Sequence, residues 1–222
     1  LVEPAQVIHL MRPGMRVFVG TGVAEPRTLV QHLMASSCNK LVDLELIQLA
    51  SFAEAVLLDN LQAQKFRLKT FFSGWVAGEA ISAGQVDLIP SSFSRIPKYI
   101  ESGRIPIDVA FIQITPPNEA GYCSLGVAVD VSRQAMEQAS LVVGEINFDI
   151  PTTFGDTFVP VSDFDYLVRS TEKPIYFDRW PVDDVFDQVA ANLASVIEDG
   201  SCLAFSPGPL FEALSRYLVH KQ

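Results

Sequence analysis

Short apolar runs alternate with segments of helical spacing along most of this chain. The runs that predict strands are 16–20, 43–51, 66–72, 86–89, 109–114 and 141–147. The segments that predict helices start near Pro26, occupy 54–64 and 75–83, form two short turns within 90–101, and end near Ala139. Branched apolar strands separated by helices are typical of a sheet that is covered on both faces. The pattern therefore predicts an α/β fold with an open, mainly parallel sheet flanked by helices.

The run Val109–Ile114 leads into the most informative loop of the chain. The loop Thr115–Gly121 contains Pro116 and Pro117, which cannot donate ladder hydrogen bonds, and the small-residue segment Tyr122–Gly126 follows it. Ligands of open α/β sheets bind beyond the carboxyl ends of the strands, so we expect this loop to line a ligand site. A rigid surface turn is the alternative that composition alone leaves open.

A second loop of this kind, Gly20-Thr21-Gly22, follows the first strand. The helix after it presents apolar residues at helical spacing, namely Leu29, Val30, Leu33 and Met34. Strand, glycines and helix in this order resemble a nucleotide-binding fingerprint, but Glu25 stands where the third glycine belongs. A tight turn between strand and helix is favoured over a ligand contact.

Several charged residues have both a functional and a structural interpretation. Arg67 and Lys69 are candidate anion contacts, although a solvated strand face is favoured. Glu145 comes late in an apolar strand, so if buried it must be paired or carry a raised pKa. We favour a structural carboxylate that holds a neighbouring loop by its N–H groups over a functional one. Asp130 or Ser132 is expected to cap the helix that ends near Ala139.

The last third of the chain predicts a change of organisation. Residues 151–181 show little periodicity and predict an extended excursion with edge strands. Residues 183–198 form the clearest amphipathic helix, which Gly200 ends, with one face made of Val185, Phe186, Val189, Leu193, Val196 and Ile197. A last strand, Cys202–Phe205, and a closing helix with Leu210, Leu214 and Leu218 complete the pattern.

Composition narrows the function classes. With 222 residues, 49% of them hydrophobic and 19% charged, the chain is neither disordered nor a coiled coil. The formal net charge of -10 argues against a nucleic-acid partner, because phosphate contacts need clustered Lys and Arg. No apolar run is long enough to span a bilayer and no signal peptide is apparent, so we expect no membrane partner.

Conventional catalytic motifs do not appear. The three cysteines, Cys38, Cys123 and Cys202, lack CxxC spacing, which suggests reduced thiols and a cytoplasmic location. His9, His32 and His220 lack metal-ligand spacing, so no metal site is expected. There is no Gly-x-Ser-x-Gly elbow and no Walker-type lysine loop. The residues alone thus predict a cytoplasmic α/β protein with a small-ligand site.

Three segments carry a family resemblance. They read VFVGTGVAEP, PIDVAFIQITPPNEAGYCSLGVAVD and EINFDIPTTFGDTF. Together they resemble the N-terminal domain of the acetyl-CoA hydrolase and 4-hydroxybutyrate CoA-transferase family, and FFSG and GQVDLIP fit the same pattern. The resemblance runs from about Val7 to His220 and is most specific over Asp108–Asp130.

The resemblance implies an α/β fold of the CoA-transferase type over residues 1–222, with a second, glutamate-bearing domain beyond Gln222. Such enzymes move coenzyme A between an acyl-CoA and a carboxylic acid. A glutamate attacks the thioester to give an acyl-glutamyl anhydride, and a glutamyl-CoA thioester follows. If water resolves that thioester, the outcome is hydrolysis. Acyl-CoA and a carboxylate are then substrates, and no permanently bound cofactor is implied.

The resemblance also assigns site residues. No catalytic nucleophile matches within this chain, and Glu145 and Asn147 are supporting residues. The loop at Ala204–Gly208 keeps only Gly208 of the family's Gln-x-Gly-x-Gly pattern, and Ala77 or Gly78 replaces a family arginine. The expected substrate- or CoA-binding residues are Gly20, Thr21, Gly22, Pro116, Pro117, Gly121, Tyr122, Ser124, Gly126, Ser206 and Gly208.

The sequence also leads to expectations about the partner of this chain and about alternative functions. The C-terminal domain of the same protein is the expected partner, and a homodimer is another way for an isolated half to cover an exposed interface. A non-catalytic, altered copy of the domain, acting as a binding or scaffold module, is the alternative that the changed Ser206–Pro209 loop favours. A generic dinucleotide-binding domain would rest on Gly20–Gly22 alone, and the missing third glycine counts against it.

Overall fold

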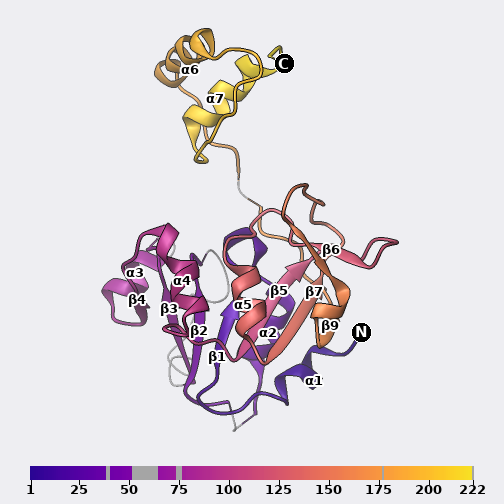
Figure 1. Ribbon diagram of the computed structural model, residues 1–222. Helices are drawn as coiled ribbons and strands as arrows, with labels where there is room; N and C mark the ends of the chain where they lie inside the picture. Colours follow the sequence, from indigo (N-terminus) through magenta and orange to yellow (C-terminus); the bar gives the residue numbers. More distant parts are fainter. Residues whose placement is uncertain (39–40, 52–64, 74–76, 177, 222) are drawn as a thin grey trace. The chain divides into compact units, whose positions relative to one another are not determined.

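A computed structural model describes residues 1–38, 41–51, 65–73, 77–176 and 178–221 (Figure 1). The chain forms two compact units, 1–175 and 176–222. The extent of the expected domain, residues 1–222, stays a prediction. The expected helix at 54–64 lies outside the described residues.

The first unit is built on a seven-stranded sheet in the order β4-β3-β2-β1-β5-β7-β9. Every neighbouring pair in it is parallel. Its strands are β1 (Arg16–Val19), β2 (Leu44–Gln48), β3 (Phe66–Thr70), β4 (Val86–Leu88), β5 (Val109–Ile114), β7 (Leu141–Ile146) and β9 (Tyr166–Arg169). The strands predicted from the apolar runs are confirmed, and β9 is the edge strand expected after Pro151.

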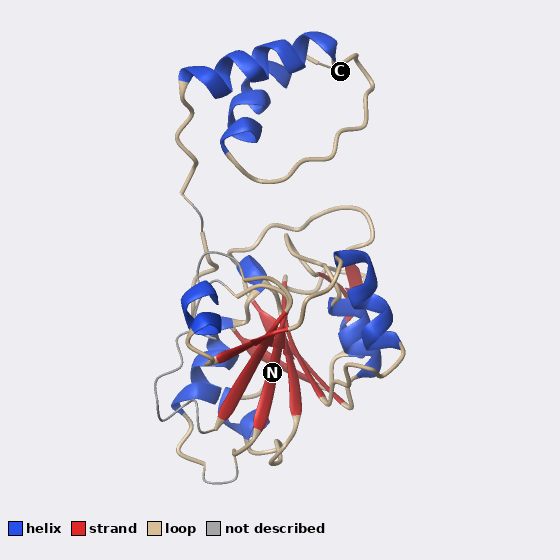
Figure 2. Cartoon of the chain, turned by 90° about the vertical axis from the view of Figure 1, so that its left-hand side faces the viewer, coloured by secondary structure: helices blue, strands red, loops and turns tan. Residues whose placement is uncertain are grey.

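Helices lie on both sides of this sheet (Figure 2). The helices are α1 (Pro4–Ile8), α2 (Arg27–Ala35), α3 (Ala77–Ser82), α4 (Ile96–Glu101) and α5 (Ser132–Gln138), with 3-10 turns η1 (Gly22–Ala24), η3 (Phe93–Arg95) and η4 (Val161–Asp163). The two short turns expected within 90–101 are η3 and α4, and Pro97 lies in the first turn of α4. A separate antiparallel pair joins β6 (Tyr122–Ser124) to β8 (Phe158–Pro160).

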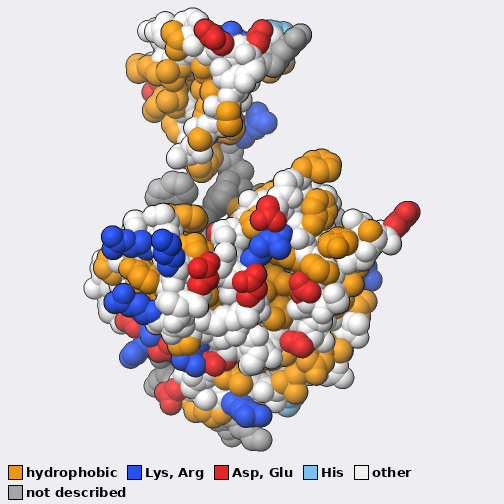
Figure 3. All heavy atoms as spheres, viewed as in Figure 1, with side chains coloured by type: hydrophobic (Ala, Val, Ile, Leu, Met, Phe, Trp, Pro, Cys, Tyr) orange, Lys and Arg blue, Asp and Glu red, His pale blue; other side chains and the backbone are white. Residues whose placement is uncertain are grey.

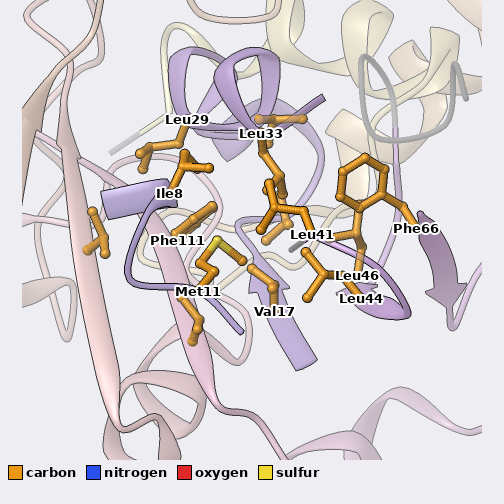
Figure 4. Packing of buried hydrophobic residues seen from close by; sticks show 14 of the residues in the cluster. Ile8, Met11, Val17, Leu29, Leu33, Leu41, Leu44, Leu46, Phe66 and Phe111 are labelled. Atoms are coloured by element: carbon orange, nitrogen blue, oxygen red, sulfur yellow. The ribbon is translucent and has the colours of Figure 1, made fainter. Parts of the chain in front are cut away.

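The core has two halves, one on each face of the sheet. Val17 and Val19 of β1 pack into one cluster with Leu29 and Leu33 of α2 (Figure 4). Phe18, the residue between them, packs into the other cluster. Successive side chains of a strand point to opposite faces, so this alternation requires apolar cover on both sides. It explains why the strands read as nearly continuous apolar runs.

Charged side chains of the sheet are paired with each other. Lys69 Nζ lies 2.7 Å from Glu45 Oε1, and Arg67 Nε lies 3.7 Å from Asp87 Oδ2. These are cross-strand pairs between β3 and its neighbours. Arg67 is exposed, as the favoured reading of a solvated strand face predicts, whereas Lys69 is partly buried.

A third ion pair joins Arg16, at the start of β1, to Asp108, the residue before β5. Asp108 accepts hydrogen bonds from the N–H, Nε and Nη2 of Arg16 at 2.8, 2.8 and 3.0 Å. The guanidinium of Arg16 holds the pKa of Asp108 below its ordinary value. A lowered folded-state pKa adds stability above the unfolded-state pKa, and that stability is lost as the pH falls through the folded-state value.

We expect Asp108→Asn to flatten this acid dependence. Urea unfolding of residues 1–222 at pH 7 and pH 3 should show a steeper loss of unfolding free energy for the wild type than for the variant. At pH 7 the variant should lose about 1 kcal/mol, since both side chains are partly exposed. Asp87→Asn, at the looser pair with Arg67, is the control. Equal pH slopes for the wild type and Asp108→Asn would contradict the role assigned to the pair.

The second unit pairs α6 (Asp184–Val196) with α7 (Pro209–Leu218). Asp183 caps α6 by accepting the N–H of Phe186 at 2.8 Å, which favours the helix start. The helices meet through Ala190, Ala194, Ala213 and Leu214. Hydrophobic side chains gather on the surface of this unit over α6 (Figure 3).

The amphipathic helix predicted at 183–198 is confirmed as α6, although Val185 and Val196 of its apolar face are 68% and 74% exposed. Two other expectations about element details were wrong. Cys202–Phe205 is irregular and exposed, since no strand in the described part of this unit pairs with it. Neither Asp130 nor Ser132 caps α5, whose N-cap is Val131 without a side-chain hydrogen bond.

Candidate functional site at the strand-order switch

The strand order reverses between β1 and β5. Strands β2, β3 and β4 extend from one side of β1, whereas β5, β7 and β9 extend from the other. The loops that follow β1 and β5 therefore leave their strands at neighbouring positions and diverge. In open α/β sheets such a switch point is where ligands bind. The two loops singled out from the sequence, Gly20–Gly22 and Pro116–Gly126, are the two loops at this point.

The Gly20–Gly22 loop is fixed by main-chain and side-chain hydrogen bonds. The N–H of Gly20 donates to Phe111 O at 3.0 Å, and that of Gly22 donates to Ala50 O at 2.9 Å. Gln48 Nε2 donates to Gly20 O at 2.8 Å and to Glu25 Oε2 at 3.0 Å. A Cβ on Gly20 would lie 2.4 Å from Ala24 O, so only glycine fits there.

A buried chain of polar side chains links this loop to β5 and β7. Gln113 Nε2 donates to Val23 O at 3.2 Å, and Gln113 Oε1 accepts from Asn147 Nδ2 at 3.0 Å. Asn147 Nδ2 also reaches Glu172 O at 3.3 Å. Gln113 and Asn147 are almost fully buried, so these bonds satisfy groups that would be costly to leave unpaired. Asn147 therefore lies where a supporting residue is expected.

Glu145 belongs to the same buried layer. Its carboxyl group accepts the N–H groups of Thr28 at 3.2 Å and Leu29 at 2.9 Å, in the first turn of α2, and the hydroxyl of Ser170 at 2.7 Å. Burial raises the pKa of Glu145, and the bonds from Ser170, Leu29 and Thr28 oppose that shift. The geometry is that of the favoured reading, a structural carboxylate that holds a neighbouring segment by its N–H groups.

The loop after β5 is a turn held by hydrogen bonds between its own residues. Asn118 Oδ1 accepts the N–H groups of Ala120 and Tyr122, each at 3.0 Å. Gly121 has φ +79°, a conformation that favours glycine, and its N–H donates to Asn118 O at 2.9 Å. Val161 N donates to Gly121 O at 2.8 Å, which ties the turn to the segment after β8. Pro116 and Pro117 lead into this turn on the surface.

The rest of this loop divides into a buried and an exposed part. Ser124 is fully buried, and its hydroxyl oxygen accepts the N–H groups of Gly126 at 3.1 Å and Thr153 at 3.3 Å. Gly126 is buried too, with φ +71°. Tyr122 is 44% exposed. The side chain of Tyr122 thus faces solvent, whereas Ser124 and Gly126 are buried and determine the backbone conformation of the loop.

Ser206 and Gly208 belong to the second unit. They line an apolar groove of about 550 Å³ together with Phe186, Leu193, Phe205 and Leu214. Gly208 is the N-cap residue of α7, with φ +156°. The nine other candidates belong to the first unit, and their contact with a ligand stays a prediction.

The remaining chemistry of the described residues is sparse. They contain no group of three or more His, Cys, Asp or Glu side chains that could hold a metal ion. The buried thiol of Cys123 has its pKa raised by burial to about 11, so it stays protonated and unreactive. Among the described helices, none has the length and apolarity needed to cross a bilayer.

Sequence reasoning missed Gln48, Gln113 and Ser170. Both glutamines stand at or near the ends of otherwise apolar buried strands, LELIQ and VAFIQI. A buried amide needs partners, so its place at a strand end was a usable signal. Ser170 carries no such signal, because only the pairing of β9 with β7 brings it to Glu145.

We expect Gly121→Val to impair turnover of the full-length protein without unfolding it. The backbone there has φ +79°, which valine adopts with strain, while a Cβ meets nothing closer than Val161 Cγ1 at 4.0 Å. A loss of about tenfold or more in kcat/KM, with cooperative urea unfolding preserved, is the expected result. Gly14→Val is the control, with φ +75° and open space before β1. Unchanged turnover by Gly121→Val would contradict the prediction that this loop lines the site.

Comparison with known proteins decides the family. A profile described as "Acetyl-CoA hydrolase/transferase N-terminal domain" matches residues 1–177, which include the whole first unit, 1–175. The chain belongs to this family. The fold and the family expected from the sequence are thereby confirmed.

Relatives of this acetyl-CoA hydrolase/transferase domain are CoA-transferases. The 4-hydroxybutyrate coenzyme A transferase of Clostridium kluyveri is 32% identical over 222 residues, which are 100% of this chain and 52% of that protein. A succinyl-CoA:acetate/propanoyl-CoA:succinate CoA transferase of Fasciola hepatica is 31% identical over 97% of this chain and 45% of its own length. The chain thus spans about half the length of the curated relatives it matches.

Solved structures agree with this assignment. The crystal structure of 4-hydroxybutyrate CoA-transferase from Porphyromonas gingivalis matches with a TM-score of 0.72 and 26% identity, over 99% of this chain and 51% of that one. RipA from Yersinia pestis matches with a TM-score of 0.87 at 22% identity, over 99% of this chain and 53% of that one, which supports the fold.

Proposed function

We propose that the full-length protein transfers coenzyme A between an acyl-CoA and a carboxylic acid, and that this chain supplies the half without the nucleophile. The observation that carries the proposal is the coincidence of the strand-order switch with the two family loops, Gly20–Gly22 and Pro116–Gly126. The names of the relatives, all CoA-transferases, support it. Acyl-CoA and a free carboxylate are the substrates, and the C-terminal domain is the partner.

The proposed chemistry proceeds through covalent steps on a glutamate beyond Gln222. Its carboxylate attacks the thioester carbonyl and expels the CoA thiolate, which leaves an acyl-glutamyl anhydride. The thiolate then attacks the glutamyl carbonyl, releases the acyl group as a carboxylate and forms a glutamyl-CoA thioester. A second carboxylate reverses these steps, whereas water would give hydrolysis. Splitting the transfer in this way lowers each barrier.

Within this chain, rigid backbone is the proposed contribution to the site. The internal bonds of Gly20–Gly22 and of the Asn118–Tyr122 turn hold their main-chain groups in fixed positions. Prearranged dipoles stabilise developing charge without reorganisation during the reaction. Glu145 holds the first turn of α2, Asn147 bonds to Gln113, which reaches Val23 O after the first loop, and neither residue takes part in bond making.

Mass spectrometry of the covalent intermediate tests this proposal. The full-length protein is incubated with acetyl-CoA, digested and mapped, with and without hydroxylamine. We expect one hydroxylamine-sensitive CoA adduct, on a glutamate downstream of Gln222, and none on residues 1–222 alone. An adduct on Glu145, or no adduct with an active protein, would contradict the proposed mechanism.

A non-catalytic binding or scaffold module is the second candidate function. The observation that favours it is the loop at Ser206–Pro209, where Pro207 has no N–H to offer a ligand. In the structure this loop lines an apolar groove. Binding of acetyl-CoA without adduct formation or turnover by the full-length protein would support this candidate.

A further inference from the structure

A small cavity lies between α1 and the last turn of α2, at the far end of α2 from the Gly20–Gly22 loop. Its volume is about 290 Å³. Ile8 of α1 packs in the same buried cluster as Leu29 and Leu33 of α2, which holds the two helices together beside the cavity (Figure 4). The polar side chains that line the cavity are His9, His32, Ser36 and Ser37. The fold thus brings to one cavity two histidines that are far apart in the sequence.

The hydrogen bonds of both imidazoles fix their tautomers. His9 Nδ1 lies 2.5 Å from Ala5 O, and His32 Nδ1 lies 2.9 Å from Thr28 O. A carbonyl oxygen only accepts hydrogen bonds, so Nδ1 carries the proton in each neutral ring and the free lone pair is on Nε2. Histidines that bind metal ions almost always donate their other ring N–H to a carbonyl or carboxylate oxygen. Both rings are therefore in the state that binds a metal ion.

The electrostatic surroundings favour a cation over an anion. His32 lies in the last turn of α2, where the helix dipole leaves partial negative charge, and His9 is the C-cap residue of α1. A lone pair on Nε2 accepts, whereas an anion needs donors. The ammonium group of Lys65 donates to Ser36 O at 3.3 Å and opposes the dipole in part, but the two neutral rings add no charge of their own.

We propose that His9 and His32 form a binding site for a divalent metal ion of the zinc, copper or nickel type, which they hold through their Nε2 atoms. Imidazole nitrogen suits these ions, whereas Mg²⁺ and Ca²⁺ prefer oxygen ligands. The described residues offer no third His, Cys, Asp or Glu there, so water and the hydroxyl groups of Ser36 and Ser37 complete the coordination. The bound ion ties α1 to α2. The spacing of the histidines in the sequence predicts no metal site, because it does not report this contact between helices.

Calorimetric titration of residues 1–222 with Zn²⁺, on protein made without a histidine tag, tests the proposal. We expect the wild type to bind Zn²⁺ and not Mg²⁺ at this site. His9→Ala and His32→Ala should each weaken Zn²⁺ binding about tenfold or more, because even the loss of a partner that only orients a ligand costs about that much. Circular dichroism checks that both variants are folded. Zn²⁺ affinity equal to that of the wild type in either variant would overturn the proposal.

His220→Ala is the matched control, since His220 is the remaining histidine of the chain. It is exposed, as His9 and His32 are, and it belongs to the second unit. Single imidazoles that bind Zn²⁺ independently should lose affinity alike when any of the three is removed. We expect His220→Ala to bind Zn²⁺ as the wild type does. An equal loss in all three variants would overturn the proposal and show adventitious binding only.

Nuclear magnetic resonance of ¹⁵N-labelled histidine in the wild type gives a readout that needs no variant. Without metal, His9 and His32 should both carry the proton on Nδ1, and Zn²⁺ should shift the Nε2 resonances of both rings together. A proton on Nε2 of either neutral ring, or a shift of one ring without the other, would overturn the proposal. Neither experiment involves acyl transfer, so the result does not depend on the proposed function.

Discussion

Gly20→Ala is expected to remove turnover of the full-length protein almost completely and to destabilise the first unit. The added Cβ would lie 2.4 Å from the carbonyl oxygen of Ala24, which is backbone and has no rotamer by which to move away. The loop must shift to remove this clash, and the shift would strain the hydrogen bonds of Gly20 with Phe111 and Gln48. Overpacking of this kind costs about 1–3 kcal/mol.

The measurement is urea unfolding together with kcat/KM for acetate and acetyl-CoA. We expect a drop of about 2 kcal/mol in unfolding free energy and a loss of at least about 100-fold in kcat/KM. Gly78→Ala is the control, because a Cβ on Gly78 in α3 meets nothing within 4 Å and alanine favours a helix. Wild-type activity and stability of Gly20→Ala would show that this loop is neither tightly built nor part of the site.

Glu145→Gln should give the second large effect, on stability and not on chemistry. The carboxyl group receives donors on both oxygens, from Thr28 and Ser170 on one and from Leu29 on the other. In the glutamine variant, the side-chain NH2 replaces one of the two oxygens and faces the donors that this oxygen accepted. Those buried donors are then left unpaired. We expect a loss of about 2–4 kcal/mol in unfolding free energy.

Activity per folded molecule separates a structural Glu145 from a catalytic one. The folded fraction of Glu145→Gln, measured by circular dichroism, should account for its whole loss of acetate exchange. Glu101→Gln, at an exposed position that ends α4, is the control and should match the wild type. A fully folded Glu145→Gln protein without exchange would overturn the structural role and make Glu145 a candidate nucleophile.

The fold was predictable because the local sequence pattern of each strand is enough to identify it. Runs such as Val109–Ile114 and Leu141–Ile146 are apolar apart from Gln113 and Glu145, since both faces of each strand are covered, and this pattern predicts a parallel sheet. The second unit was less predictable. Cys202–Phe205 has a strand-like sequence, but a strand also needs a neighbour, and no local pattern reports whether a neighbour is present.

The site was predictable at the level of loops and not of side chains. Glycines and prolines marked Gly20–Gly22 and Pro116–Gly126, because turns depend on local backbone chemistry. The partners of those loops come from other strands, as Gln48 and Gln113 do, and only the strand order brings them together. Asp130 was predicted to cap α5 because its spacing fits a cap, but its carboxyl group accepts the N–H of Val131, the residue before the helix.

Exchange of labelled acetate into acetyl-CoA tests the central claim most directly. It is measured for residues 1–222 and for the longest product of the gene that encodes them, at equal concentrations. We predict exchange by the long product and none by residues 1–222, because we propose that the glutamate that carries CoA lies beyond Gln222. Exchange by residues 1–222 alone would contradict that division of labour. Exchange by neither would contradict the transferase assignment and favour a binding module.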